Sequence, residues 1–126
     1  MRILKTKYFN SWADDEDLDD ESLCDAIKEM NQGLHNGDLG GKIFKKRVAR
    51  QGQGKSGGYR TIVALQVKER AFFLYGFGKN ERANISQKEK KAFKKLAKEL
   101  LGYTEEALDK AVNNSVFFEV NCNEQE

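Results

Sequence analysis

The sequence predicts an α+β protein with two N-terminal helices, a small antiparallel sheet and one or two C-terminal helices. Apolar residues recur at helical spacing near the start, short β-branched and aromatic runs fill the middle, and a helix-capping motif follows them. With 126 residues, 39% of them hydrophobic, the chain can build one core. We expect residues 1–126 to form one domain, with an acidic helical part (1–38), a basic sheet part (39–80) and C-terminal helices and a strand (86–120).

The first elements are short. Residues 2–5 are typical of a short edge strand. Phe9, Trp12 and Ala13 then follow at the spacing i, i+3, i+4, which predicts a helix over about residues 7–15.

A second helix lies in the most acidic stretch, which holds nine carboxylates and one lysine between residues 14 and 29. Asp19 or Asp20 can cap it, and Gly33 can end it. Its apolar stripe consists of Leu23, Ala26, Ile27 and Met30. Capping and the helix dipole explain part of the acidic cluster, which weakens the case for a metal site.

Three strands are predicted in the middle of the chain, over about residues 42–49, 58–67 and 71–77. The segment "LHNGDLGG" before them is predicted to be a loop. Only residues 68–70 separate the last two strands, which favours an antiparallel hairpin.

The C-terminal part begins with a capping box, in which Ser86 is followed three residues later by Glu89. The helix that starts there carries six lysines and stops at Gly102. Thr104 can cap a short helix to about Ala111, and residues 115–120 predict a last strand.

The loop predicted after the first of the three strands contains Gly-Lys-Ser at residues 54–56. The same three residues end the motif of a nucleotide-binding P-loop. A P-loop needs a glycine where this chain has Ala49, and a helix directly after the motif. The residues that follow predict a strand instead. We therefore expect a connection between two strands and no nucleotide cofactor.

The net charge of +2 hides a strong segregation. Residues 39–67 contain seven lysines and arginines and neither Asp nor Glu. Positive potential concentrated on part of a small surface indicates an anionic polymer as partner. The basic residues are Lys42, Lys45, Lys46, Arg47, Arg50, Lys55 and Arg60.

Other classes of chemistry find little support. Cys24 and Cys122 lie far apart in sequence without metal-ligand spacing, so we expect reduced thiols and no zinc. His35 is the only histidine and is interpreted as incidental. Without an apolar run of eighteen residues or a signal peptide, the expected location is the cytosol, with no membrane partner.

Two blocks of the sequence, "KKRVARQGQGKSGGYRT" and "FFLYGFGKNERANIS", resemble in this order the RelE/HigB-like toxins of bacterial type II toxin–antitoxin systems, members of the RelE/ParE superfamily. The resemblance extends weakly over most of the chain. It implies the helix and sheet order predicted above, cleavage of mRNA in the ribosomal A site, and silencing by a cognate antitoxin, expected to be a helix-turn-helix protein. The implied partners are therefore the ribosome, mRNA and this antitoxin.

The resemblance also suggests site residues. Metal-independent cleavage uses the RNA 2′-OH as nucleophile, so the enzyme must move protons and stabilise charge on the phosphate. Arg60 is expected at the scissile phosphate, with Lys55 and Lys79 as further catalytic residues. The expected RNA-binding residues are Lys45, Lys46, Arg47, Arg50, Tyr59 and Arg82.

Some positions depart from the family pattern. Asn80 stands where an arginine is usual, and Ser86, better explained as a helix cap, stands where a tyrosine is usual. The catalytic acid and base therefore stay unassigned. Tyr59 can equally be a core residue or stack on a base, whereas the aromatic run at residues 72–77 is interpreted as core. An alternative is a non-catalytic inhibitor of the ParE type, acting on DNA gyrase.

Overall fold

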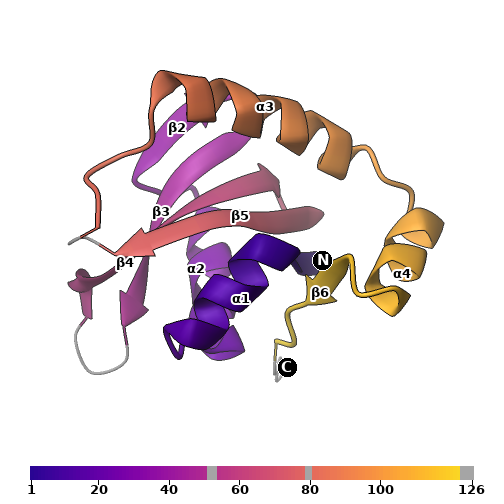
Figure 1. The fold of residues 1–126 in the computed structure, drawn as a ribbon, viewed down its shortest axis with the longest axis horizontal. Coiled ribbons are helices and arrows are strands. Elements are labelled where there is room, and N and C mark those ends of the chain that lie inside the picture. The colour runs from indigo at the N-terminus through magenta and orange to yellow at the C-terminus, as the bar shows by residue number, and fades with distance from the viewer. Residues whose placement is uncertain (51–53, 79–80, 123–126) are drawn as a thin grey trace.

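A computed structural model describes residues 1–50, 54–78 and 81–122, and its α+β architecture confirms the predicted fold class. Across these residues, six strands form one mostly antiparallel sheet in the order β2-β3-β4-β5-β1-β6 (Figure 1). The elements are β1 (Arg2–Thr6), α1 (Lys7–Asp15), α2 (Asp20–Met30), β2 (Gly37–Gly40), β3 (Ile43–Arg50), β4 (Gly54–Gln66), β5 (Arg70–Gly78), α3 (Gln87–Leu101), α4 (Glu105–Asn113) and β6 (Phe117–Glu119).

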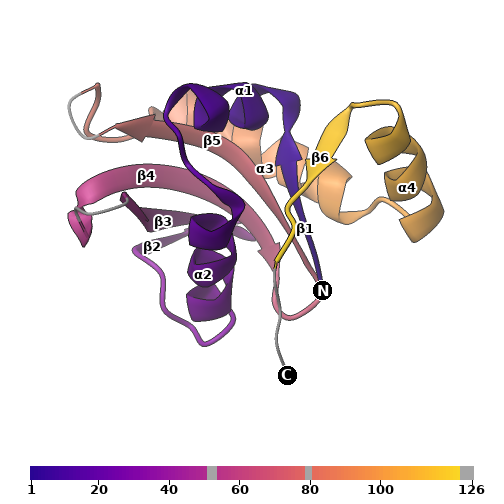
Figure 2. The ribbon, with the colours of Figure 1, turned by 90° about the horizontal axis from the view of Figure 1, so that it is seen from below.

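The helices form a layer on each side of the sheet. Figures 1 and 2 show α1 and α2 on one face and α3 on the other, with α4 beside β6. Each face has its own buried cluster: Phe9, Leu23 and Phe73 belong to the α1/α2 side, and Phe72 and Leu100 to the α3 side. The two faces of β4 and β5 are therefore both largely apolar near the middle of the sheet.

Helix caps form as the sequence predicts. The Asp19 carboxylate accepts a hydrogen bond from the Ser22 amide at 2.9 Å, and the capping box of Ser86 and Glu89 is complete. Thr104 caps α4 by accepting a hydrogen bond from the Ala107 amide. These contacts are local, so each is specified by residues three positions apart.

The position of β1 differs from the prediction of an edge strand, which is wrong. β1 pairs in parallel with β5, where Ile3 lies opposite Ala71, and antiparallel with β6, where Lys5 lies opposite Phe118. The burial of Leu4 between these neighbours is complete. Both pairings join segments more than sixty residues apart, which is why the local pattern does not reveal them.

The segment predicted as a loop before β3 contains a strand. β2 pairs antiparallel with β3, with Gly37 opposite Lys45, and the turn between them passes through Gly40, Gly41 and Lys42, all at positive φ. β4 begins earlier than predicted, at Gly54, so the Gly-Lys-Ser motif lies in a strand where the sequence predicts a loop. A strand and not a helix follows the motif, as expected.

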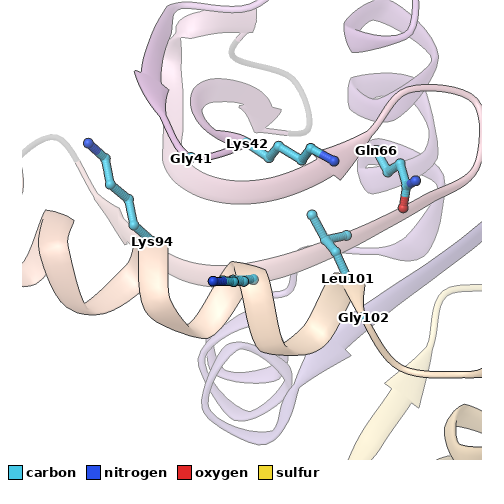
Figure 3. A pocket seen from close by; sticks show the side chains of 7 residues that line it. Gly41, Lys42, Gln66, Lys94, Leu101 and Gly102 are labelled. Atoms are coloured by element: carbon cyan, nitrogen blue, oxygen red, sulfur yellow. The ribbon is translucent and has the colours of Figure 1, made fainter.

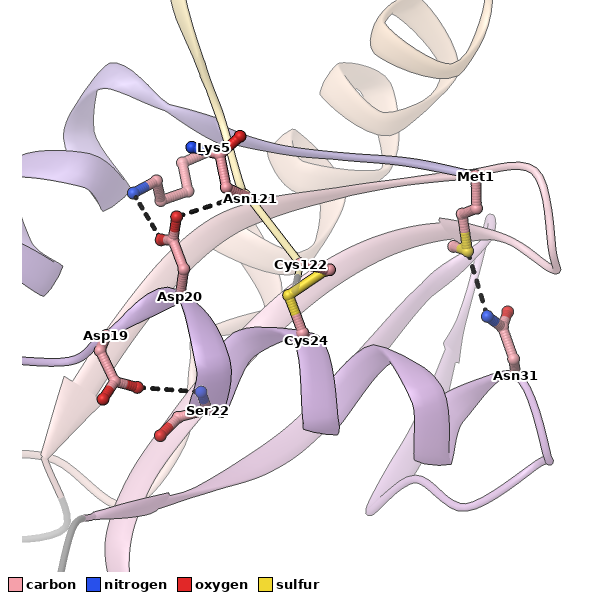
Figure 4. Close-up of a disulfide and its surroundings, with 9 residues drawn as sticks. All are labelled: Met1, Lys5, Asp19, Asp20, Ser22, Cys24, Asn31, Asn121 and Cys122. Carbon is pink, nitrogen blue, oxygen red and sulfur yellow. Dashed lines mark hydrogen bonds and ion pairs between the residues drawn. A yellow bond between two sulfur atoms is a disulfide. The ribbon is translucent and has the colours of Figure 1, made fainter. Parts of the chain in front are cut away.

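The two cysteines form a disulfide, so the expectation of reduced thiols is wrong. Cys24 of α2 bonds Cys122, with Cα atoms 5.7 Å apart across a sequence separation of 98 residues (Figure 4). The pairing arises because β6 runs beside β1, and the chain beyond it then reaches α2. The Asp20 carboxylate supports the same contact, accepting hydrogen bonds from Lys5 Nζ at 3.3 Å and the Asn121 amide at 3.0 Å.

Among the described residues, no helix combines the length and apolar character that a membrane span requires.

Candidate nucleic-acid interface

The candidate interface is built on the alternation of side chains along β4. Tyr59 and Val63 belong to the buried cluster on the α1/α2 side, whereas Ile62 belongs to the cluster on the α3 side. Because successive side chains of a strand point to opposite faces, Arg60 projects to the same side as Ile62. The arginine therefore lies on the same face of the sheet as α3.

Arg60 has a second arginine beside it. The register places Arg47 of β3 directly opposite Arg60, and Phe77 of β5 opposite it on the other side. Directly paired residues project to the same face of a sheet. Arg60 is partly buried and Arg47 exposed, and neither side chain forms an ion pair with any residue in the described ranges.

The next row of the sheet adds a lysine. Lys45 lies opposite Ile62, which lies opposite Tyr75. We call Lys45, Arg47 and Arg60 the cationic strand surface. Three cations on two neighbouring strands, without a carboxylate partner among the described residues, favour binding of an anionic ligand.

Arg82 borders this surface but already has a partner. Its guanidinium donates two hydrogen bonds to the Glu89 carboxylate, at 2.9 and 2.6 Å, and one to the Tyr75 hydroxyl at 3.1 Å. It also lies 5.8 Å from the ring centroid of Tyr75 and 5.7 Å from that of Phe77. The bond from Arg82 lowers the pKa of Glu89 to about 2, so the pair stays charged at neutral pH. Arg82 therefore links the start of α3 to β5, and Glu89 offsets its charge.

An exposed aromatic residue completes the border, and the sequence analysis missed it. Tyr8 is 56% exposed and stacks on Tyr75, with ring centroids 5.3 Å apart and an interplanar angle of 12°. Partial burial of the phenol raises the pKa of Tyr8, and Tyr75 adds to the rise. The available signal was that Tyr8 lies outside the apolar stripe of its helix, which Phe9 and Trp12 carry.

Two expected RNA-binding residues, Lys46 and Tyr59, are buried on the α1/α2 side of the sheet, away from the cationic strand surface. Lys46 is 4% exposed on the α2 side, where its Nζ forms an ion pair with Glu29 at 2.6 Å and donates to the Leu34 carbonyl at 3.0 Å. Tyr59 is 3% exposed, and its hydroxyl donates to the Glu16 carboxylate at 3.0 Å. Neither side chain therefore lies on the cationic strand surface, because alternate residues of β3 and β4 enter the core beneath α1 and α2, and their roles in RNA binding stay predictions.

Three other expected residues cannot be placed. Lys79 lies outside the described residues, and so do the side chains of Arg50 and Lys55, although their backbones belong to β3 and β4. The structure therefore brings together Lys45, Arg47 and Arg60 from the expected set.

The aromatic residues of β5 are mostly core, as predicted. Phe72 and Phe73 are fully buried and Phe77 is 2% exposed. His35 lies on the surface, and its Nδ1 accepts a hydrogen bond from the Gly37 amide at 3.2 Å, which gives it a local structural contact. Within the described ranges, no group of three or more His, Cys, Asp or Glu residues is arranged to hold a metal ion.

Comparison with known families gives one match that covers nearly all of the chain. The family model described as "RelE toxin of RelE / RelB toxin-antitoxin system" matches residues 1–120. No curated protein matches the sequence.

Proposed function

Because this chain belongs to the RelE family of toxin–antitoxin toxins, we propose that it is a metal-independent endoribonuclease that cleaves mRNA on the ribosome. The observation that carries the proposal is the pairing of Arg60 with Arg47 on one face of the sheet, without an internal counter-ion among the described residues. Two opposed arginines repel each other until an anion lies between or above them. A phosphodiester backbone supplies that anion.

The chemistry assigned to Arg60 is stabilisation of the transition state. When the RNA 2′-OH attacks its own phosphate, negative charge grows on the phosphate oxygens. A guanidinium can donate two parallel hydrogen bonds to those oxygens and stays protonated throughout the reaction. In this proposal Arg60 contacts the scissile phosphate, and Lys45 and Arg47 hold neighbouring phosphates.

Lys55 and Lys79 stay in the proposal as further catalytic residues, and Arg50 as an RNA contact. Their sequence positions within the two blocks support these roles. Tyr8 joins the proposal as a stacking surface for an unpaired base, because its exposed ring is already held parallel to Tyr75.

Membership of the family implies an antitoxin as partner. We propose that it is a helix-turn-helix protein and that it covers the cationic strand surface, because masking phosphate-binding residues blocks a substrate of the same charge most directly.

Mapping of RNA ends in cells tests the function. Expression of the wild type should stop translation and produce mRNA 5′ ends at ribosomal A sites. Arg60→Ala should leave messages intact while the protein stays folded and still co-sediments with ribosomes. Lys95→Ala is the matched control, because Lys95 is an exposed cation of α3 outside the cationic strand surface.

Other results would reject the proposal. Growth arrest with intact mRNA and induced DNA damage would instead favour inhibition of DNA gyrase, the activity of ParE-type relatives. Unfolding of Arg60→Ala, measured by circular dichroism, would give this arginine a structural role.

A further inference from the structure

A second cationic feature lies on the α3 side at the other end of β4. A cavity of about 430 Å³ opens between the C-terminal half of α3, the start of β3 and the end of β4. Lys42, Lys94 and Lys98 line it together with Gln66 and Leu101, and we call it the lysine pocket. Figure 3 shows the Leu101 side chain pointing toward the gap between Lys42 and Gln66, and Lys94 rising from α3 beside Gly41.

The backbone around the pocket is shaped for close contact with α3. Gly41 has φ +59°, and a Cβ atom there would lie 3.0 Å from Lys94 Cγ. The stem of Lys94 therefore packs directly on the turn, which fixes its position. Lys42 itself has φ +66°, a left-handed conformation that residues other than glycine rarely adopt. Strain of this kind is often kept where a side chain has a function.

The charge of the pocket is not balanced within the described chain. None of its three lysines forms an ion pair with a described residue, and neither Asp nor Glu lines the cavity. Lys98 lies in the last turn of α3, where it complements the helix dipole. Lys42 lies in the turn between β2 and β3, and Lys94 lies two turns before the end of α3, so the dipole does not account for them. A cavity lined by three lysines and by Leu101 matches a ligand that is both acidic and apolar.

We propose that the lysine pocket binds an acidic segment of the antitoxin, with carboxylates on the lysines and one apolar side chain on Leu101. The inference rests on the antitoxin partner that the family implies and does not require RNA cleavage. Gln66 and Arg60 are six positions apart on β4, which is roughly 20 Å at about 3.3 Å per residue, and Lys45 is three positions from Lys42, roughly 10 Å. The pocket therefore adjoins the cationic strand surface without sharing a residue with it, and anchors the antitoxin beside it. Leu101 gives the pocket an apolar contact, which suits a polypeptide better than a sugar–phosphate backbone, because the backbone needs only the cations for its recognition.

Charge reversal tests the proposal. The probe is the purified protein encoded by the reading frame next to this gene, provided that it forms a complex with the wild type, and its affinity is measured by calorimetry. Lys94→Glu/Lys98→Glu should weaken binding by about tenfold or more, because each reversal places a negative charge beside an acidic ligand. Lys91→Glu/Lys95→Glu is the matched control, with the same helix, spacing and charge change at exposed positions outside the pocket. It should change the affinity by less than about twofold.

A third variant tests the pocket without changing Lys94. This is needed because Lys94 also packs on the turn at Gly41, so its substitution could disturb the fold. Lys42→Gly removes one pocket cation at a position whose φ favours glycine, so it should weaken antitoxin binding without loss of stability. Equal affinities for the wild type and all variants would overturn the proposal.

Chemical labelling of the wild-type complex gives independent evidence. Amine acetylation read by mass spectrometry should show Lys42, Lys94 and Lys98 protected by the antitoxin, while Lys91 and Lys95 still react. Uniform reactivity would reject the pocket as the docking site. Loss of ribosome binding instead of antitoxin binding in the pocket variants would assign the pocket to RNA and also overturn the proposal.

The same variants separate this inference from the proposed nuclease. In cells without antitoxin, Lys94→Glu/Lys98→Glu should cleave mRNA like the wild type. If no version of the protein cleaves RNA, the nuclease proposal fails while the antitoxin affinities still decide the role of the pocket.

Discussion

Arg47 and Arg60 lie directly opposite each other on β3 and β4, and neither has an ion-pair partner among the residues that the structure describes. Like charges in this position destabilise a sheet by up to about 1 kcal/mol. The arrangement is therefore costly for the free protein and favourable once an anion is bound. It makes separate predictions for catalysis and for stability.

Arg60→Gln should reduce the single-turnover rate of RNA cleavage by about a hundredfold, since one well-placed donor to a developing oxyanion contributes on the order of 3 kcal/mol. Lys55→Ala and Lys79→Ala should each show a smaller loss. Urea denaturation of Arg60→Gln should show unchanged or slightly higher stability, because the repulsion with Arg47 is removed. A large fall in stability would contradict this account of Arg60.

The affinity for single-stranded RNA should fall steeply with salt. Neutralisation of three phosphates by Lys45, Arg47 and Arg60 corresponds to a log-log slope of about −2, at about −0.7 per phosphate. Arg47→Ala should make the slope shallower by about 0.7 units. Fluorescence anisotropy across a salt series measures both values, and Lys46→Ala serves as comparison because Lys46 is buried against Glu29. A flat salt response would refute the nucleic-acid interface.

Gly76 is predicted to be intolerant of any side chain. A Cβ atom there would lie 2.3 Å from Trp12 Cζ3, within a ring that packs on the sheet. Gly76→Ala should therefore destabilise the protein by about 1–3 kcal/mol, the usual cost of overpacking. Gly78→Ala in the same strand is the control, because the nearest atoms to its Cβ would belong to the Glu81 side chain, at 3.5 Å and beyond, which is ordinary van der Waals contact. Thermal melts that shift equally for both variants would contradict the prediction.

Reduction of the Cys24–Cys122 disulfide should lower the free energy of unfolding by about 2–4 kcal/mol, because the bond closes a loop of nearly the whole chain and restricts the unfolded state. Urea denaturation with and without a reducing agent measures the difference. Cys122→Ser should match the reduced wild type and should not respond to reductant. If reduction leaves the stability unchanged, the bond does not form in solution.

The Arg82–Glu89 pair predicts a defined behaviour in acid. The pKa of Glu89 is lowered from 4.5 to about 2 in the folded protein, first by the hydrogen bond from Arg82 and then by that from the Ser86 backbone. The stabilisation from this carboxylate is therefore complete above about pH 4.5 and is lost as the pH falls toward 2. Carbon-detected NMR of the Glu89 carboxyl group should show the low pKa in the wild type. In Arg82→Ala the pKa should move up toward its usual value, and an unchanged titration would exclude the pair.

The sequence by itself determined the elements whose signals are local. The capping box at Ser86 and Glu89 begins α3, and a three-residue connection joins β4 to β5. Both depend on interactions between residues close in the chain, so they persist whatever the rest of the protein does. The same holds for the basic composition of β3 and β4, which pointed to Lys45, Arg47 and Arg60.

Only the tertiary structure decided which basic residues remain on the surface. Lys45 and Lys46 are neighbours in sequence, yet Lys46 is buried in an ion pair with Glu29 while Lys45 stays on the α3 side with the arginines. The outcome depends on where α2 packs, which no local pattern contains. The same reason explains why Tyr8 stacks on Tyr75, why β1 lies inside the sheet between β5 and β6, and why Cys24 bonds Cys122. Each joins segments that are distant in sequence, and such contacts form only when the burial of both cores outweighs the entropy lost in closing long loops.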